Sequence, residues 1–200
     1  MSVAILGGSF DPVHNGHLHL LSCLLRYTSC GTVLIVPANE SNFKRDCPAV
    51  ATAAQRLEML SLALKDFIKS NPKLVRGRNL VIDEFELRRG GVSYTSETVR
   101  DIRERFGPDE ELYLVIGDDH LPRLGQWHDF DYLRQNVVFV VFRRLGSDLK
   151  GPEGAKCVFI DNPVYDGSAS EIRRGERFEQ LLPPSVAAYA RKHGLYCKAD

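Results

Sequence analysis

The sequence predicts an α/β fold, in which one domain is built on a doubly wound parallel sheet with helices on both faces. Short apolar segments, typical of strands buried on both faces, alternate along the chain with amphipathic segments of helical period. Strands that alternate with helices form parallel sheets, because each crossover helix packs back onto the sheet. The length of 200 residues fits a single well-cored domain, residues 1–200.

The first elements set this pattern. Residues 3–6 (VAIL) form a short apolar run that two glycines end, which predicts a buried strand closing in a turn. A helix follows, because Leu18, Leu21 and Leu25 recur at helical spacing and form one apolar stripe. Residues 32–37 (TVLIVP) are the next buried strand, ended by proline.

The rest of the chain continues the alternation. Residues 38–52 are polar and irregular and predict a loop, whose motion the composition leaves open. The predicted elements beyond it are helices over 53–69 and 96–106, strands over 79–89, 111–117, 136–144 and 156–161, and a closing helix over 182–195. We expect the short C-terminal helical part, about residues 167–195, to belong to the same domain.

Charge and cysteine usage narrow the class of protein. Lys plus Arg and Asp plus Glu both number 26, so no basic excess indicates nucleic acid or an anionic membrane as a partner. No apolar run approaches the length of a membrane span or a signal peptide. The five cysteines are scattered without metal-site or disulfide spacing. We therefore expect a cytoplasmic protein. Any anion-binding site in it is expected to be formed by a few neighbouring groups and not by an overall positive charge.

Four segments that follow predicted strands are candidates for one shared site. In open parallel sheets, ligands bind beyond the carboxyl ends of the strands, where the strand order reverses. The segments are residues 7–17, 37–44, 117–128 and 162–173. We therefore expect the motifs in these four segments to contribute to one site.

The segment GGSFDPVHNGHL, residues 7–18, carries the most specific pattern. Glycines after a first strand let backbone N–H groups approach an anion, and the helix that follows adds its positive N-terminal end. His14 and His17 lie one turn apart, where imidazoles can donate hydrogen bonds to phosphoryl oxygens. Either histidine alone is as readily a helix cap or a packed side chain, and HxxH lacks the spacing of a zinc helix. The segment matches neither GxGxxG nor the P-loop.

This segment resembles the motif of the HxGH nucleotidyltransferase superfamily, and nearly the whole chain is similar to its nicotinate mononucleotide adenylyltransferase branch. The resemblance implies a Rossmann-like fold and a reaction that joins ATP and a pyridine mononucleotide into a dinucleotide with loss of pyrophosphate. It also implies Mg²⁺, carried by ATP and not by a metal site of the protein. Rival interpretations are phosphopantetheine adenylyltransferase, a cytidylyltransferase, or a non-catalytic nucleotide sensor.

The resemblance also assigns residues to roles. GSASEIR, residues 167–173, is similar to the ISSTxIR motif of the family, although Gly167 and Ala169 depart from it, and Ser168 with Glu171 forms a capping box. Asp118 and His120 depart from the family pattern and receive no role. The phosphate-binding charges are expected at His14, His17, Lys44 and Arg173, with Arg45 an alternative to Lys44. The nucleotide-binding residues are expected to be Gly7, Gly8, Ser9, Phe10, Gly16, Ile116, Gly117, Asp119, Ser168 and Ser170. The pyridine substrate is expected at Thr95, Trp127 and His128.

The expected chemistry needs no side-chain nucleophile. The 5′-phosphate of the acceptor is already ionised at neutral pH and can attack the α-phosphorus of ATP in line. Catalysis then depends on holding two polyanions in register and offsetting their repulsion. The choice between nicotinate and nicotinamide, and the oligomeric state, stay open.

Overall fold

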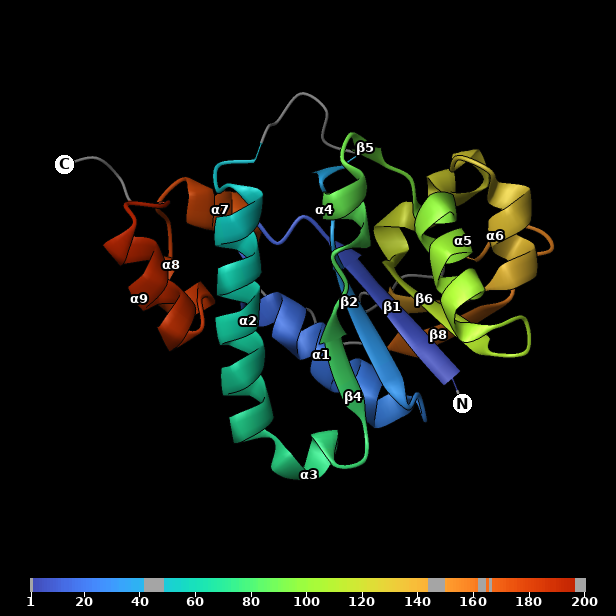
Figure 1. Cartoon of the computed structure of the whole chain (residues 1–200), viewed down its shortest axis with the longest axis horizontal. Helices are drawn as coiled ribbons and strands as arrows, with labels where there is room; N and C mark the ends of the chain where they lie inside the picture. The colour runs from blue at the N-terminus through green and yellow to red at the C-terminus, as the bar shows by residue number, and fades with distance from the viewer. Residues whose placement is uncertain (1, 42–48, 144–149, 162–164, 166, 197–200) are drawn as a thin grey trace.

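The computed structural model describes residues 2–41, 49–143, 150–161, 165 and 167–196 (Figure 1). At its centre lies a six-stranded sheet in the order β4-β2-β1-β6-β7-β8, and its neighbouring strands are parallel. The strands are β1 (Ser2–Gly8), β2 (Thr32–Pro37), β4 (Asn79–Ile82), β6 (Glu111–Gly117), β7 (Val138–Arg143) and β8 (Cys157–Asp161). The predicted doubly wound α/β fold is confirmed.

Helices cover both faces of the sheet, because strand residues alternate between two apolar cores. Ala4 and Leu6 of β1 belong to one core, and Val3 and Ile5 belong to the other. The first core also takes side chains from α1 (Asn15–Tyr27), α2 (Ala53–Ser70), α7 (Ala169–Arg173), α8 (Phe178–Leu181) and α9 (Pro184–Lys192). The second takes side chains from α5 (Thr95–Phe106), the 3₁₀ helix η1 (Asp118–Gln126) and α6 (Phe130–Asn136). The C-terminal helices therefore share a core with the first strand.

The predicted strand over residues 79–89 is wrong in its second half. Strand β4 ends at Ile82, and residues Phe85–Arg89 form the short helix α4. The buried side chain of Asp83 accepts a hydrogen bond from the backbone N–H of Phe85 at 3.0 Å, which turns the chain out of the strand. Helix α3 (Pro72–Val75), helix α6 and η1 were not predicted either.

The strand order reverses between β1 and β6. The chain adds β2 and β4 on one side of β1, and then crosses over to add β6, β7 and β8 on the other. The loops that follow β1 and β6 therefore meet at one rim, where ligands of such sheets bind. A separate two-stranded parallel sheet, β3 (Glu40–Ser41) with β5 (Val92–Ser93), joins the segment after β2 to the segment before α5.

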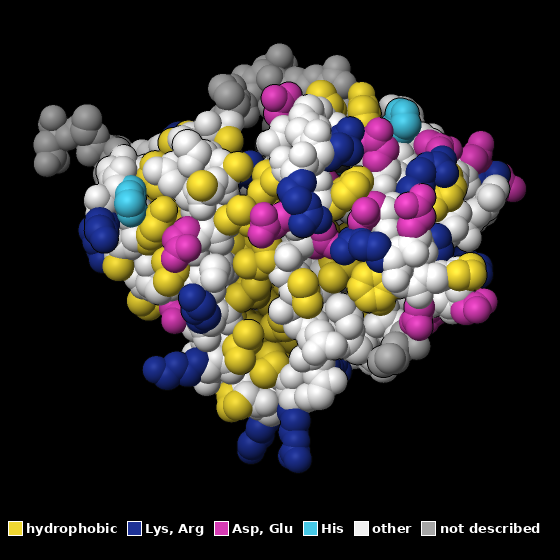
Figure 2. Space-filling model, viewed as in Figure 1, with side chains coloured by type: hydrophobic (Ala, Val, Ile, Leu, Met, Phe, Trp, Pro, Cys, Tyr) yellow, Lys and Arg dark blue, Asp and Glu magenta, His cyan; other side chains and the backbone are white. Residues whose placement is uncertain are grey.

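The surface seen in Figure 2 mixes acidic and basic side chains, with apolar side chains exposed in a furrow between them. In the described part of the chain, no helix combines the length and the apolar character needed to span a membrane.

Candidate active site

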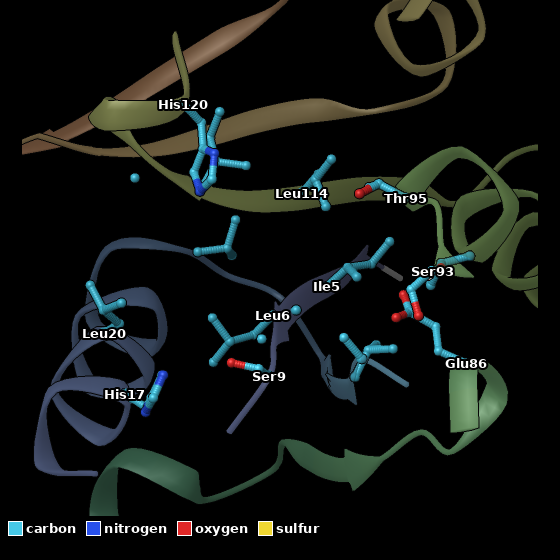
Figure 3. A pocket seen from close by; sticks show the side chains of 18 of the residues that line it. Ile5, Leu6, Ser9, His17, Leu20, Glu86, Ser93, Thr95, Leu114 and His120 are labelled. Atoms are coloured by element: carbon cyan, nitrogen blue, oxygen red, sulfur yellow. Dashed lines mark hydrogen bonds between the residues drawn. The ribbon is translucent and has the colours of Figure 1, made fainter. Parts of the chain in front are cut away.

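A cavity of about 360 Å³ opens at the rim where the strand order reverses (Figure 3). Its wall combines the ends of β1 and β6 with residues of α1, α4, α5 and η1. The predicted site residues on the wall are Gly7, Gly8, Ser9, His17, Thr95, Ile116, Gly117, Asp119 and Trp127. Segments that are far apart in the sequence, such as the loop after β1 and Trp127, therefore meet in one cavity.

Both histidines of the HxGH motif have defined positions at the start of α1. His14 is the N-cap, and its Nδ1 accepts a hydrogen bond from the backbone N–H of Gly16 at 3.1 Å. Nδ1 of His17 in turn accepts from the backbone N–H of His14 at 3.1 Å, which completes a capping box. The two ring centroids lie 3.8 Å apart. The capping interpretation and the binding interpretation of these residues are therefore compatible.

The capping box also determines the tautomer of the two rings. A ring nitrogen that accepts a hydrogen bond from a backbone N–H must present a lone pair, so Nδ1 is unprotonated in both residues. In a neutral imidazole the proton is then on Nε2, which makes Nε2 a hydrogen-bond donor. Donors of this kind are what a phosphoryl oxygen requires.

The loop between β1 and α1 is held by side chains from distant parts of the chain. Arg56 of α2, which is 2% exposed, donates to the carbonyl oxygens of Ser9 at 2.7 Å and of Ala38 at 2.6 Å. Burial lowers the pKa of Arg56, and the nearby charge of Asp11 opposes this shift. Arg56 is therefore not a surface residue of its helix: it connects the glycine-rich loop to the segment after β2.

Arg173 also reaches this loop. Its guanidinium donates to the backbone carbonyl of Asp11 at 2.8 Å and to the hydroxyl of Ser170 at 3.1 Å. Ser168 is the N-cap of α7, where its hydroxyl accepts from the backbone N–H of Glu171 at 3.3 Å, which confirms the predicted cap. Ser168, Ser170 and Arg173 thus lie on a short helix that contacts the histidine-bearing loop, although they do not line the cavity.

The remaining predicted residues lie in different places. Phe10 is buried beneath Gly8, with its ring centroid 4.9 Å from that of His17. His128 does not line the cavity. It is exposed, and its Nδ1 lies 2.9 Å from the hydroxyl of Ser96, while its ring lies against Tyr94. Lys44 and Arg45 lie outside the described residues.

Several residues of the cavity wall were not predicted. They include Leu20, Glu86, Ser93, Thr98 and His120. The ring of His120 stands edge-on to Trp127, with centroids 5.5 Å apart. Figure 3 places Ser9, His17 and Leu20 on one side of the cavity and Glu86, Ser93 and Thr95 on the other. On this second side, only Thr95 was predicted from the sequence.

Comparisons with known proteins agree with this geometry. Residues 5–175 match the family model described as cytidylyltransferase-like. A probable nicotinate-nucleotide adenylyltransferase of Klebsiella pneumoniae is 34% identical over 97% of this chain and 96% of its own. A probable nicotinate-nucleotide adenylyltransferase of Streptococcus mutans is 35% identical over 97% of this chain and 88% of its own.

A solved structure has the same fold. The nicotinic acid mononucleotide adenylyltransferase of Plasmodium falciparum, complexed with NaAD, superposes with a TM-score of 0.76 at 19% identity, over 98% of this chain and 97% of the other. The solved structure supports the fold, and the two relatives, which match over 97% of this chain, indicate the specific branch within the broad cytidylyltransferase-like group. The chain belongs to the nicotinate-nucleotide adenylyltransferase family.

Proposed function

We propose that this protein transfers the adenylyl group of ATP to nicotinate mononucleotide, giving nicotinate adenine dinucleotide and pyrophosphate, a step of NAD biosynthesis. The observation that carries the proposal is the composition of the cavity. The glycine-rich loop and His17 lie on one side of the cavity. Thr95 and Trp127 also form part of the cavity wall. A phosphate-binding loop and an aromatic platform in one cavity suit the joining of two nucleotides.

The reaction follows from the charges of its two substrates. An oxygen of the acceptor 5′-phosphate attacks the α-phosphorus of ATP, the α–β bridging P–O bond breaks, and pyrophosphate leaves. The protein supplies position and charge stabilisation: backbone N–H groups of the loop and Nε2–H of His14 and His17 donate to phosphate oxygens. We assign Lys44 and Arg173 as the cations that offset the repulsion between the substrates. Thr95 and the start of α5 take the pyridine carboxylate, and Trp127 stacks on the ring.

Magnesium fits this site as an ion carried mainly by the substrate. Mg²⁺ usually binds one or two carboxylates together with substrate phosphates, and the cavity wall has Asp119 as an exposed carboxylate. Within the described residues, no three His, Cys, Asp or Glu side chains are grouped to hold a metal. When bound to the triphosphate, Mg²⁺ would neutralise charge on the leaving pyrophosphate. The free thiols of Cys30 and Cys157 suit the reducing cytoplasm, where we place the enzyme.

The direct test is formation of the dinucleotide by the purified protein with ATP, Mg²⁺ and nicotinate mononucleotide, measured by chromatography. We expect His17→Ala to lower kcat at least ~100-fold, the usual scale for losing a preorganised donor, in a protein that remains folded. His19→Ala is the matched control, because His19 lies two residues further along α1 and does not line the cavity.

The same assay separates the proposal from its rivals. Phosphopantetheine as acceptor, or CTP as donor, should give no product above background. Faster turnover with either of these substrates than with the proposed pair, or wild-type turnover in a folded His17→Ala protein, would refute the assignment.

A further inference from the structure

Glu86 is a buried carboxylate in the cavity that the proposed phosphate chemistry does not use. It belongs to α4, and only 8% of its surface is exposed. Its side chain forms part of the cavity wall, and in Figure 3 it lies beside Ser93, on the same side of the cavity as Thr95. It therefore lies on the side of the cavity that we assign to the pyridine nucleotide.

The partners of Glu86 leave its charge uncompensated. The hydroxyl of Thr98 donates to its Oε1 at 2.6 Å. Within the described ranges of the chain, no Lys, Arg or His side chain forms an ion pair with it. A buried carboxylate that has a hydroxyl partner but no cation keeps part of its desolvation cost. A positively charged ligand next to Glu86 would offset that cost.

Trp127 adds a second preference for positive charge. It lines the same cavity, and the face of an indole ring attracts cations. An indole and a buried carboxylate together favour a flat aromatic cation. Of the two bases in the proposed reaction, only the pyridine ring has this character: bonded to ribose through its nitrogen, it is a pyridinium cation, whereas adenine is neutral at pH 7.

We propose that Glu86 is a specificity-determining residue that recognises the positive charge of the pyridinium ring. This inference rests on the proposed function and adds a substrate feature to it. The carboxylate substituent of nicotinate is bound separately, at the start of α5. Glu86 therefore selects pyridinium nucleotides over nucleotides with neutral bases, and it directs the acceptor and ATP to different sides of the cavity.

The test compares two acceptors that differ only in ring charge. One is nicotinate mononucleotide, and the other is its C-nucleoside analogue, in which ribose is joined through a ring carbon and the ring is neutral. In the wild-type protein we expect the pyridinium acceptor to bind at least about tenfold more tightly, since a charge pair near a protein surface contributes on this scale. In Glu86→Gln, which keeps an oxygen to accept from Thr98, we expect the two affinities to agree within about threefold.

Two further variants distinguish the loss of charge recognition from a structural effect of the Glu86 substitution. Glu84→Gln removes the same charge from the exposed N-cap of α4 and should keep the wild-type preference. Glu86→Asp keeps the negative charge and should therefore keep part of the preference for the pyridinium acceptor. The KM for ATP should not change in any of these variants.

Calorimetric titration of each acceptor makes the inference independent of turnover. A wild-type protein that discriminates between the two acceptors but makes no dinucleotide would overturn the proposed function and leave the role of Glu86 supported. A Glu86→Gln protein that keeps the wild-type ratio of affinities, or loses affinity equally for both acceptors, would overturn the role of Glu86.

Discussion

Gly16 lies beneath the ring of His14, where an added Cβ atom would approach Cε1 and Nδ1 of that ring to 2.9 Å and Cδ1 of Tyr165 to 3.0 Å. We therefore expect Gly16→Ala to push the imidazole of His14 away from the backbone N–H that it accepts from. Because a displacement of about 1 Å in a site can cost ~100-fold in rate, kcat/KM should fall on that scale. Alanine is favoured over glycine in helices by about 1 kcal/mol, which opposes the steric cost to stability.

Steady-state kinetics and a thermal melt of the same preparation check this expectation. Gly125→Ala is the control, since no atom lies within 4 Å of a Cβ added there. If Gly16→Ala retains wild-type kcat/KM, the packing of the His14 ring has no part in catalysis.

At the scale of residues, the sequence predicted what depends on local spacing. His14, Gly16 and His17 interact within one helical turn, so the motif alone contains their geometry. Glu86 could not be found this way, because its hydrogen-bond partner, Thr98, belongs to another helix. The position of His128 could not be predicted for the same reason: its contact with Ser96 joins residues 32 positions apart.

Among the elements, α4 shows why a periodic pattern can mislead. The segment NLVIDEFELRR has partial alternation, and the structure divides it into a four-residue strand and a five-residue helix. Asp83 separates the strand from the helix. Its side chain accepts a hydrogen bond from the backbone N–H of Phe85 and forms an ion pair with Arg105. The adjacent acidic residues in the middle of an apolar run were the available signal. The partner Arg105 comes from α5, which the local sequence does not reveal.

Helix α7 yields a prediction about pH. The pKa of Glu171 is lowered, chiefly because the hydroxyl of Ser168 donates to its carboxylate at 2.8 Å, with Arg177 a smaller cause. A carboxyl group with a depressed pKa stabilises the folded state above its unfolded-state pKa, and this contribution is lost as the pH falls through the folded-state value. We expect Ser168→Ala to raise the pKa of Glu171 toward its ordinary value, measured by NMR titration of the side-chain carboxyl.

Arg177→Gln is the comparison for this prediction. It should raise the pKa of Glu171 by less than Ser168→Ala does, because the charge of Arg177 is among the smaller causes. An equal or larger rise in Arg177→Gln would mean that the ion pair, not the cap, controls this carboxyl group.

Over the whole molecule, the alternation of strands and helices was sufficient to predict the sheet, because topology rules leave few arrangements for such a pattern. The contacts that hold the site together were not predictable. Asp11 accepts hydrogen bonds from the backbone N–H groups of Val50 and Ala51 and from the hydroxyl of Tyr196, which lies 185 residues away. No periodic signal links residues at such a separation.

Asp11 therefore joins the loop after β1 to the end of the chain. Its side chain is 4% exposed, and the bond from Tyr196 is 2.6 Å long. Burial, followed by this hydrogen bond, raises the pKa of Tyr196 well above the ordinary value for tyrosine. A group with a raised folded-state pKa stabilises the fold below its unfolded-state pKa, near 10, and this stability is lost as the pH rises through the folded-state value.

Removing the hydroxyl tests this long-range connection. Tyr196→Phe leaves the ring in the core and takes one donor from a buried carboxylate, a loss of about 1.5–3 kcal/mol that should lower the melting temperature by ~3–12 °C. Because Asp11 also bonds to Arg173 through its carbonyl, kcat should fall together with stability. Tyr189→Phe, on the partly exposed face of α9, should change neither quantity. If Tyr196→Phe melts and turns over as the wild-type protein does, the C-terminal segment does not hold the phosphate loop in place.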